Sequence, residues 1–188
     1  MRVIAGTARG RRLKAPPGRS TRPTSDRVRE ALFSSLRDET PQAVVLDLFA
    51  GTGAVGIEAL SRGAAHAVFV ENDPSALAVI ADNITAAGVA DRATVVRSDA
   101  AAFVARPPRS AAGPFTIVYC DPPYDEPLDA IMGLLTDLQP HLAAGVTVVI
   151  ERERRDPALD RLEGGPLAVD RQRSYGDTVL CYLRVKDV

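Results

Sequence analysis

The chain has 188 residues, of which 46% are hydrophobic and 25% charged, and its formal net charge is −1. This length suits one well-buried domain and is marginal for two, and the composition excludes wholesale disorder. No run approaches the roughly 18 apolar residues of a membrane span, and the N-terminus lacks an apolar signal core, so we expect a cytoplasmic protein. The two cysteines lie in apolar runs and there are only two histidines, so we expect neither a disulfide nor a metal site.

Charge is distributed unevenly along the chain. Residues 1–29 contain nine Lys or Arg and one acid, a local net charge of +8, so the remainder carries −9. This asymmetry indicates a basic arm for a polyanion attached to an acidic body, although a solvated basic face is an alternative interpretation. We expect residues 1–23 to form an RNA-binding arm and residues 24–188 the main domain. The side chains expected to contact RNA are Arg9, Arg11, Arg12, Arg22, Arg27 and Arg29.

The N-terminal region predicts a ribbon followed by a helix. Two short runs flank a glycine in residues 2–16 and predict a small β-ribbon. A loop leads to a helix in which apolar residues recur every four positions from Val28 to Leu36. This spacing places Arg27 and Arg29 away from the apolar face.

Residues 44–63 predict a strand, a tight turn and a helix. Gly51, Gly53 and Gly56 would let backbone N–H groups approach a ligand and let the helix pack closely on its strand. The spacing alone is weak evidence, because it also fits a dinucleotide site or a plain connecting turn. Asp47, near the end of the strand, would repel a pyrophosphate. It would suit a cationic ligand such as the amino-acid end of S-adenosylmethionine.

The rest of the chain alternates strands with helices. This alternation predicts an α/β fold with a doubly wound, mostly parallel sheet of seven strands that ends in an antiparallel hairpin. After the first strand, the predicted strands are 66–71, 92–98, 115–120, 145–151, 167–175 and 178–185, and the later helices are 74–87 and 125–138.

Acidic residues follow two of these strands. Glu71 lies about 20 residues beyond the glycine turn, where such folds hold a pair of ribose hydroxyls. Asp99 follows the third strand and would reach an adenine amino group, or alternatively cap the next helix. Residues 121–124, Asp-Pro-Pro-Tyr, follow the fourth strand.

The glycine turn together with Asp-Pro-Pro-Tyr resembles S-adenosylmethionine-dependent methyltransferases that act on exocyclic amino groups. In such a site Asp121 and the carbonyl of Pro122, held rigidly by Pro123, would accept both N–H bonds of the target amine. Tyr124 would stack on the base, a contact worth roughly 1–3 kcal/mol. An ordinary turn is the alternative interpretation of these four residues.

The resemblance extends over nearly the whole chain. Residues 2–6, 10–11, 22–33 and 69–71, with the late Tyr175-Gly, look like the bacterial small-subunit ribosomal RNA guanine-N2 methyltransferases. It implies a Rossmann-like class I methyltransferase that modifies one guanine amino group in an assembling 30S subunit, acts as a monomer and uses S-adenosylmethionine. The cofactor-binding residues expected on this basis are Asp47, Phe49, Ala50, Gly51, Thr52, Gly53, Gly56, Glu71, Asn72, Asp99, Ala100 and Asp121.

Three rival functions stay open at this point. A nicotinamide-dependent oxidoreductase would share the turn and Glu71 but would have no use for Asp-Pro-Pro-Tyr. An adenine-N6 methyltransferase would share both motifs, although a DNA enzyme normally needs an additional recognition region. A non-catalytic RNA-binding assembly protein could use the same basic arm.

Overall fold

The computed structural model describes residues 1–15, 25–111, 113–123, 125–157, 159, 162 and 167–185. The predicted loop at 16–24, with Arg22, lies outside these residues, and so does Tyr124.

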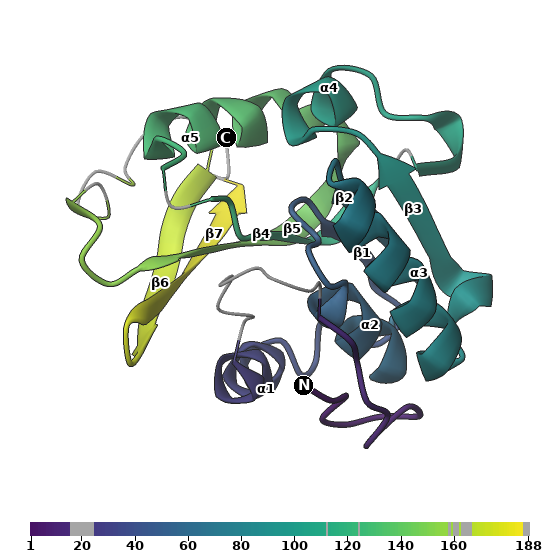
Figure 1. Ribbon diagram of the computed structural model, residues 1–188. Coiled ribbons are helices and arrows are strands. Elements are labelled where there is room, and N and C mark those ends of the chain that lie inside the picture. The colour runs from purple at the N-terminus through teal and green to yellow at the C-terminus, as the bar shows by residue number, and fades with distance from the viewer. Residues whose placement is uncertain are drawn as a thin grey trace.

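A seven-stranded sheet in the order β3-β2-β1-β4-β5-β7-β6 forms the centre of the molecule (Figure 1). Neighbouring strands from β3 to β5 pair in parallel, whereas β7 is antiparallel to both β5 and β6. The strands are β1 (Val44–Asp47), β2 (His66–Glu71), β3 (Ala93–Arg97), β4 (Phe115–Cys120), β5 (Leu142–Glu153), β6 (Leu167–Tyr175) and β7 (Thr178–Val185). This architecture confirms the predicted fold class.

Helices cover both faces of the sheet (Figure 1). Buried side chains of α1, α2 and α3 join one hydrophobic cluster, and those of α4 and α5 join the other. None of these helices, within the described ranges, is long and apolar enough to cross a membrane. The helices are α1 (Asp26–Ser35), α2 (Ala54–Ser61), α3 (Pro74–Ala87), α4 (Ala100–Ala105) and α5 (Leu128–Asp137), with 3₁₀ turns at Ala90–Arg92, Arg109–Ala111 and Gln139–His141.

Local sequence explains where the helices begin and end. The Ser25 side chain accepts a hydrogen bond from the Val28 N–H at the start of α1. Asp73 caps α3 in the same way, with Pro74 at the first helical position, and Gly88 ends that helix in the left-handed region. These caps fix α3 beside α2, against the strands that carry the cleft.

The predicted N-terminal ribbon is reduced to one antiparallel bridge, between Arg2 and Arg12. Around this bridge the Val3 N–H donates to the Arg11 carbonyl at 2.9 Å and the Leu13 N–H to the Met1 carbonyl at 3.1 Å, so residues 1–15 form a short N-terminal hairpin whose Val3 and Leu13 side chains join the core cluster of α2 and α3. Gly6 lies so close to α2 that a Cβ there would stand 1.8 Å from the Ser61 carbonyl oxygen. The segment therefore packs on the main core as an integral part of it.

Arg29 does not lie on the surface, and its predicted contact with RNA is wrong. Its side chain is fully buried and pairs with Asp26 at 3.0 Å and with Glu58 at 3.6 Å. It also donates to the carbonyl of Arg2. Because Glu58 is itself fully buried, it requires a cation nearby, and that requirement draws Arg29 inward.

Glu58 links the N-terminal segment to two helices. It accepts hydrogen bonds from the N–H groups of Ile4 at 2.8 Å and Ala5 at 3.0 Å. On the surface side it pairs with Arg62 at 2.7 Å. A single carboxylate of α2 thus accepts two N–H groups of residues 1–15 and pairs with one cation of α1 and with the arginine that follows α2.

We predict that Glu58→Ala lowers the free energy of unfolding by about 3–5 kcal/mol, because it removes the buried acid beside the Arg29 guanidinium and the acceptor of the Ile4 and Ala5 N–H groups. Urea unfolding followed by circular dichroism measures this change. The control is Lys14→Ala, which removes only the exposed Lys14–Asp82 pair and should cost less than about 1 kcal/mol. Equal losses in the two variants would contradict the prediction.

Candidate functional site

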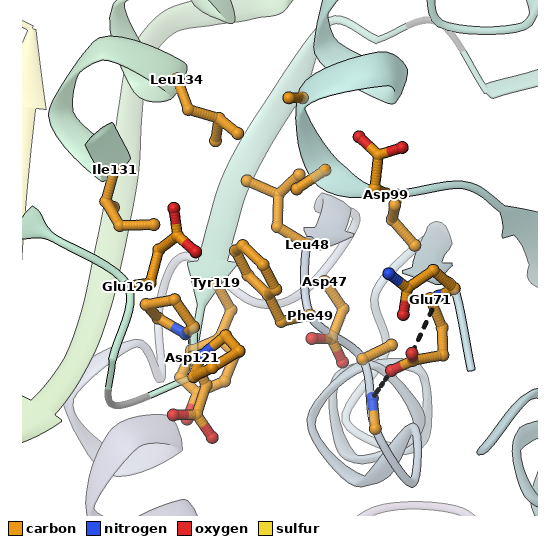
Figure 2. A pocket seen from close by; sticks show the side chains of 18 of the residues that line it. Asp47, Leu48, Phe49, Glu71, Asp99, Tyr119, Asp121, Glu126, Ile131 and Leu134 are labelled. Atoms are coloured by element: carbon orange, nitrogen blue, oxygen red, sulfur yellow. Dashed lines mark hydrogen bonds between the residues drawn. The ribbon is translucent and has the colours of Figure 1, made fainter.

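A cleft of about 1100 Å³ opens where the parallel strands end, between α4 and α5 (Figure 2). Its size suits a nucleotide-type ligand. Gly53 and Gly56 do not contribute to its described lining. Predicted site residues that line it are Asp47, Phe49, Ala50, Gly51, Thr52, Glu71, Asn72, Asp99, Ala100, Asp121, Pro122 and Pro123.

The glycine turn requires glycine at two positions. Gly51 has φ +54° and Gly53 has φ +74°, both in the left-handed region. Gly53 caps α2 without a side-chain hydrogen bond, and Ala54 and Val55 of the first helical turn line the cleft. The backbone is therefore exposed to a ligand at this point.

Gly56 serves packing and lies away from the cleft surface. A Cβ at this position would stand 2.3 Å from the ring of Phe69 on β2. Its N–H donates to Asp47 at 3.2 Å. Gly56 therefore lets α2 approach the sheet and holds the acid beneath the turn.

Asp47 is a buried acid at the end of β1, only 1% exposed. Burial raises its pKa to about 7, the Gly56 N–H opposes that shift, and the negative charge of Glu71 adds to it. An approaching positive charge would favour the ionised form.

Glu71 ties the glycine turn to the end of β2. One carboxylate oxygen accepts from the Gly51 N–H at 2.9 Å, and the other accepts from the N–H groups of Asn72 and Asp73 at 2.8 Å each. Figure 2 shows Glu71 against the turn, with hydrogen bonds drawn as dashed lines. Glu71 therefore shapes the turn as well as lining the cleft.

Asp99 caps α4, as one of the two interpretations of its position in the sequence predicts. Its carboxylate accepts a hydrogen bond from the Ala102 N–H at 2.8 Å. The same side chain lines the cleft, on the side opposite α5 (Figure 2). Capping and contact with a ligand are compatible at this position.

Asp121 directly follows β4. Burial raises its pKa well above the ordinary value, the charges of Glu151 and Asp47 add to the shift, and Arg152 opposes it. Tyr119, on β4, donates its hydroxyl to Glu151. Acidic groups at the ends of β1, β4 and β5 thus face a shared region.

Two parts of this site were not predicted from the sequence. Glu151 was one; it ends the predicted strand 145–151, which was the available signal, although β5 continues two residues further, to Glu153. The apolar wall of the cleft was the other, and it includes Val104 of α4 with Ile131 and Leu134 of α5. The apolar spacing of α5 could have indicated a buried face but not its position opposite the turn.

The predicted RNA-contacting arginines divide into two groups. Arg9, Arg11, Arg12 and Arg27 are exposed, whereas Arg29 is buried. The exposed four belong to the N-terminal hairpin and α1, outside the described lining of the cleft.

A family model described as "Conserved hypothetical protein 95" matches residues 1–184. The chain belongs to this family. Ribosomal RNA small subunit methyltransferase D of Escherichia coli K12 is 42% identical over 73% of this chain and 67% of its own length. The protein of the same name from Haemophilus influenzae is 33% identical over 85% of this chain and 82% of its own.

Solved structures agree with the family assignment. A hypothetical protein of Thermus thermophilus is 34% identical and superposes with a TM-score of 0.81, covering 98% of this chain and 99% of the other. The agreement spans both the sheet and the N-terminal segment, since nearly the whole of each chain is covered.

We predict that Asp47→Asn removes a pH dependence of stability. Because the pKa of Asp47 is 3.8 ordinarily and about 7 in the fold, the folded state binds more protons between about pH 4 and pH 7, and stability falls as pH rises through that window. The unfolding free energy of Asp47→Asn relative to the parent should therefore increase across it, by up to about 4 kcal/mol. Urea unfolding at a series of pH values tests this, and parallel curves would refute it.

Proposed function

We propose that this protein transfers a methyl group from S-adenosylmethionine to the N2 amino group of one guanine in small-subunit ribosomal RNA, within an assembling 30S particle. The observation that carries the proposal is that Asp121-Pro-Pro and the glycine turn line the same cleft. The names of the relatives support ribosomal RNA as the substrate.

The cleft residues fit S-adenosylmethionine. Asp47 would accept the ammonium of its amino-acid end, and the turn at Gly51 would lie against it without a Cβ in the way. Asp99 would accept from the adenine amino group. When bound, S-adenosylmethionine supplies a methyl group activated by a positively charged sulfur.

Glu71 would hold the ribose, but the hydrogen bonds that it already accepts limit how many ribose hydroxyls it can bind. A carboxylate oxygen offers about two lone pairs, and one oxygen of Glu71 already accepts from two N–H groups. Within the part of the chain that the structure describes, the other accepts from Gly51 alone. We therefore assign one strong ribose hydroxyl contact to Glu71, where the sequence suggested two.

Asp121 would position the target amine and receive its proton. The carboxylate would accept an N–H bond while the carbonyl of Pro122 accepts the other. As nitrogen forms its new bond to carbon it must lose one proton, and a carboxylate with a raised pKa is a better proton acceptor than an ordinary aspartate. Most of the rate enhancement would come from positioning and electrostatics.

The exposed arginines of the N-terminal hairpin would dock the RNA. Arg9, Arg11 and Arg12 lie within residues 1–15, a segment that packs on α2 and α3 and that Asn83 links, at Lys14, to Thr52 of the glycine turn. Phosphate contacts there would hold the RNA beside the cleft.

In the deciding experiment, the purified protein is incubated with labelled S-adenosylmethionine and with either small subunits that lack the modification or duplex DNA. Nuclease digestion and mass spectrometry should find N2-methylguanosine in the subunits. N6-methyladenosine would instead support the adenine-specific alternative. RNA binding without any methyl transfer would support a non-catalytic assembly factor.

We predict that Asp121→Ala lowers single-turnover methyl transfer by at least about 100-fold at saturating cofactor, since its main partner is the target amine. Affinity for S-adenosylhomocysteine, measured by calorimetry, should change much less. Asp129→Ala removes an exposed acid of α5 and serves as the control. Near-normal turnover in Asp121→Ala would refute its role.

We predict that Arg11→Ala combined with Arg12→Ala weakens RNA binding and lowers its salt slope by roughly 0.7–0.9 for each phosphate that is no longer neutralised. Affinity for S-adenosylhomocysteine should stay unchanged, because neither side chain lines the cleft. Arg109→Ala, an exposed arginine between α4 and β4, is the control. An unaltered slope in the double variant would show that the arm is merely solvated.

A further inference from the structure

Asn83 is a buried polar residue of α3 to which the proposed reaction gives no role. Its side chain is 1% exposed. The amide oxygen accepts from the Lys14 N–H at 2.7 Å, and the amide nitrogen donates to the Lys14 carbonyl at 3.1 Å and the Thr52 carbonyl at 2.9 Å. One amide therefore joins the end of the N-terminal hairpin to the glycine turn.

Both ends of that hairpin meet the turn at the same residue. The Thr52 hydroxyl lies 3.7 Å from the Met1 sulfur, and the Leu13 N–H donates to the Met1 carbonyl at 3.1 Å. Thr52 lies between the two left-handed glycines and lines the cleft. The segment that carries the exposed arginines is thus fixed directly to the proposed cofactor cradle.

Packing alone does not account for an asparagine here. The other buried residues of α3 are Ala76, Ile80, Ile84 and Ala87, all apolar. A buried amide costs free energy unless every group on it is paired, and Asn83 pairs both donor hydrogens and its acceptor oxygen with the backbone. The requirement for asparagine therefore lies in the two segments that it joins.

We propose that Asn83 is a positioning residue that couples cofactor binding to RNA docking. A ligand that orders the Thr52 peptide also orders the Lys14 backbone through the shared amide, so RNA meets a hairpin that is already fixed. By linkage, RNA then tightens cofactor binding by the same factor. This inference rests on the proposed function, since it requires that the cleft holds the cofactor and that the hairpin holds the RNA.

The test compares RNA affinity with and without saturating S-adenosylhomocysteine. In the parent, the ligand should tighten RNA binding at least about fivefold. In Asn83→Asp the ratio of RNA affinity with S-adenosylhomocysteine to RNA affinity without it should fall to within about twofold of 1. The isosteric carboxylate lacks both N–H donors to the Thr52 and Lys14 carbonyls. Asn83→Ala should lower this ratio in the same way.

Two controls separate coupling from stability. Ile84→Ala deletes a buried side chain of the same helix and should destabilise the fold while keeping the ratio. Lys14→Ala removes the exposed pair with Asp82 and leaves the Lys14 backbone in place, so it should also keep the ratio.

Two further measurements do not depend on the ratio. In Asn83→Asp, KM for RNA and for cofactor should rise while kcat at saturation changes by less than about threefold, because Asn83 is not part of the described lining of the cleft that holds Asp121. In the parent, hydrogen exchange of the Lys14 amide, which donates to Asn83, should slow when S-adenosylhomocysteine binds.

The outcomes are distinguishable. If the parent methylates ribosomal RNA but its RNA affinity does not change when S-adenosylhomocysteine is added, the coupling is overturned and the proposed function is not. An unchanged ratio in Asn83→Asp, or an equal loss in Ile84→Ala, overturns the role of Asn83. A parent that binds no S-adenosylhomocysteine overturns the proposed function and the coupling together.

Discussion

Parallel strands end at the same edge of a sheet, and the polar groups of the cleft depend on this constraint. Asp47 on β1 is in register with Phe69 of β2 on one side and with Tyr119 of β4 on the other. Glu71 lies two residues further along β2, so the strand pleat places it on the same face as Asp47, and Asp121 follows directly on the last residue of β4. Residues that are 74 positions apart in the chain therefore meet without any loop having to bring them together.

Elements whose signals are local could be predicted from the sequence. The residues of β4 are mostly β-branched or aromatic, with Pro114 before them and Asp-Pro-Pro after them, and the predicted limits, 115–120, match the structure. The terminal hairpin also matches, because Gly176-Asp177 marks its turn. Most of the cofactor residues that the family resemblance implies line one cleft, since they lie at or just beyond the carboxyl ends of β1, β2, β3 and β4.

The predictions from sequence fail where a partner that is distant in the chain decides the position of a side chain. The helix pattern around Arg29 predicts a solvent-facing cation, and nothing near it in the sequence reveals that Glu58 is buried 29 residues later. The role of Asn83 could not be predicted for the same reason, because its partners Lys14 and Thr52 lie on two other segments. Local periodicity reports which face is apolar, but it does not report which polar group on that face will find a partner.

The long-range docking of the first fifteen residues has a consequence for biosynthesis. The partners of this segment lie 53 to 69 positions later, at Glu58, Ser61 and Asn83. Val3 and Leu13 therefore stay uncovered during translation until α2 and α3 have left the ribosomal exit tunnel. Contacts of such sequence separation form slowly. Residues 1–15 are thus synthesised well before the residues that fix them, and a nascent chain stalled before residue 83 exposes Val3 and Leu13 to chaperones and proteases.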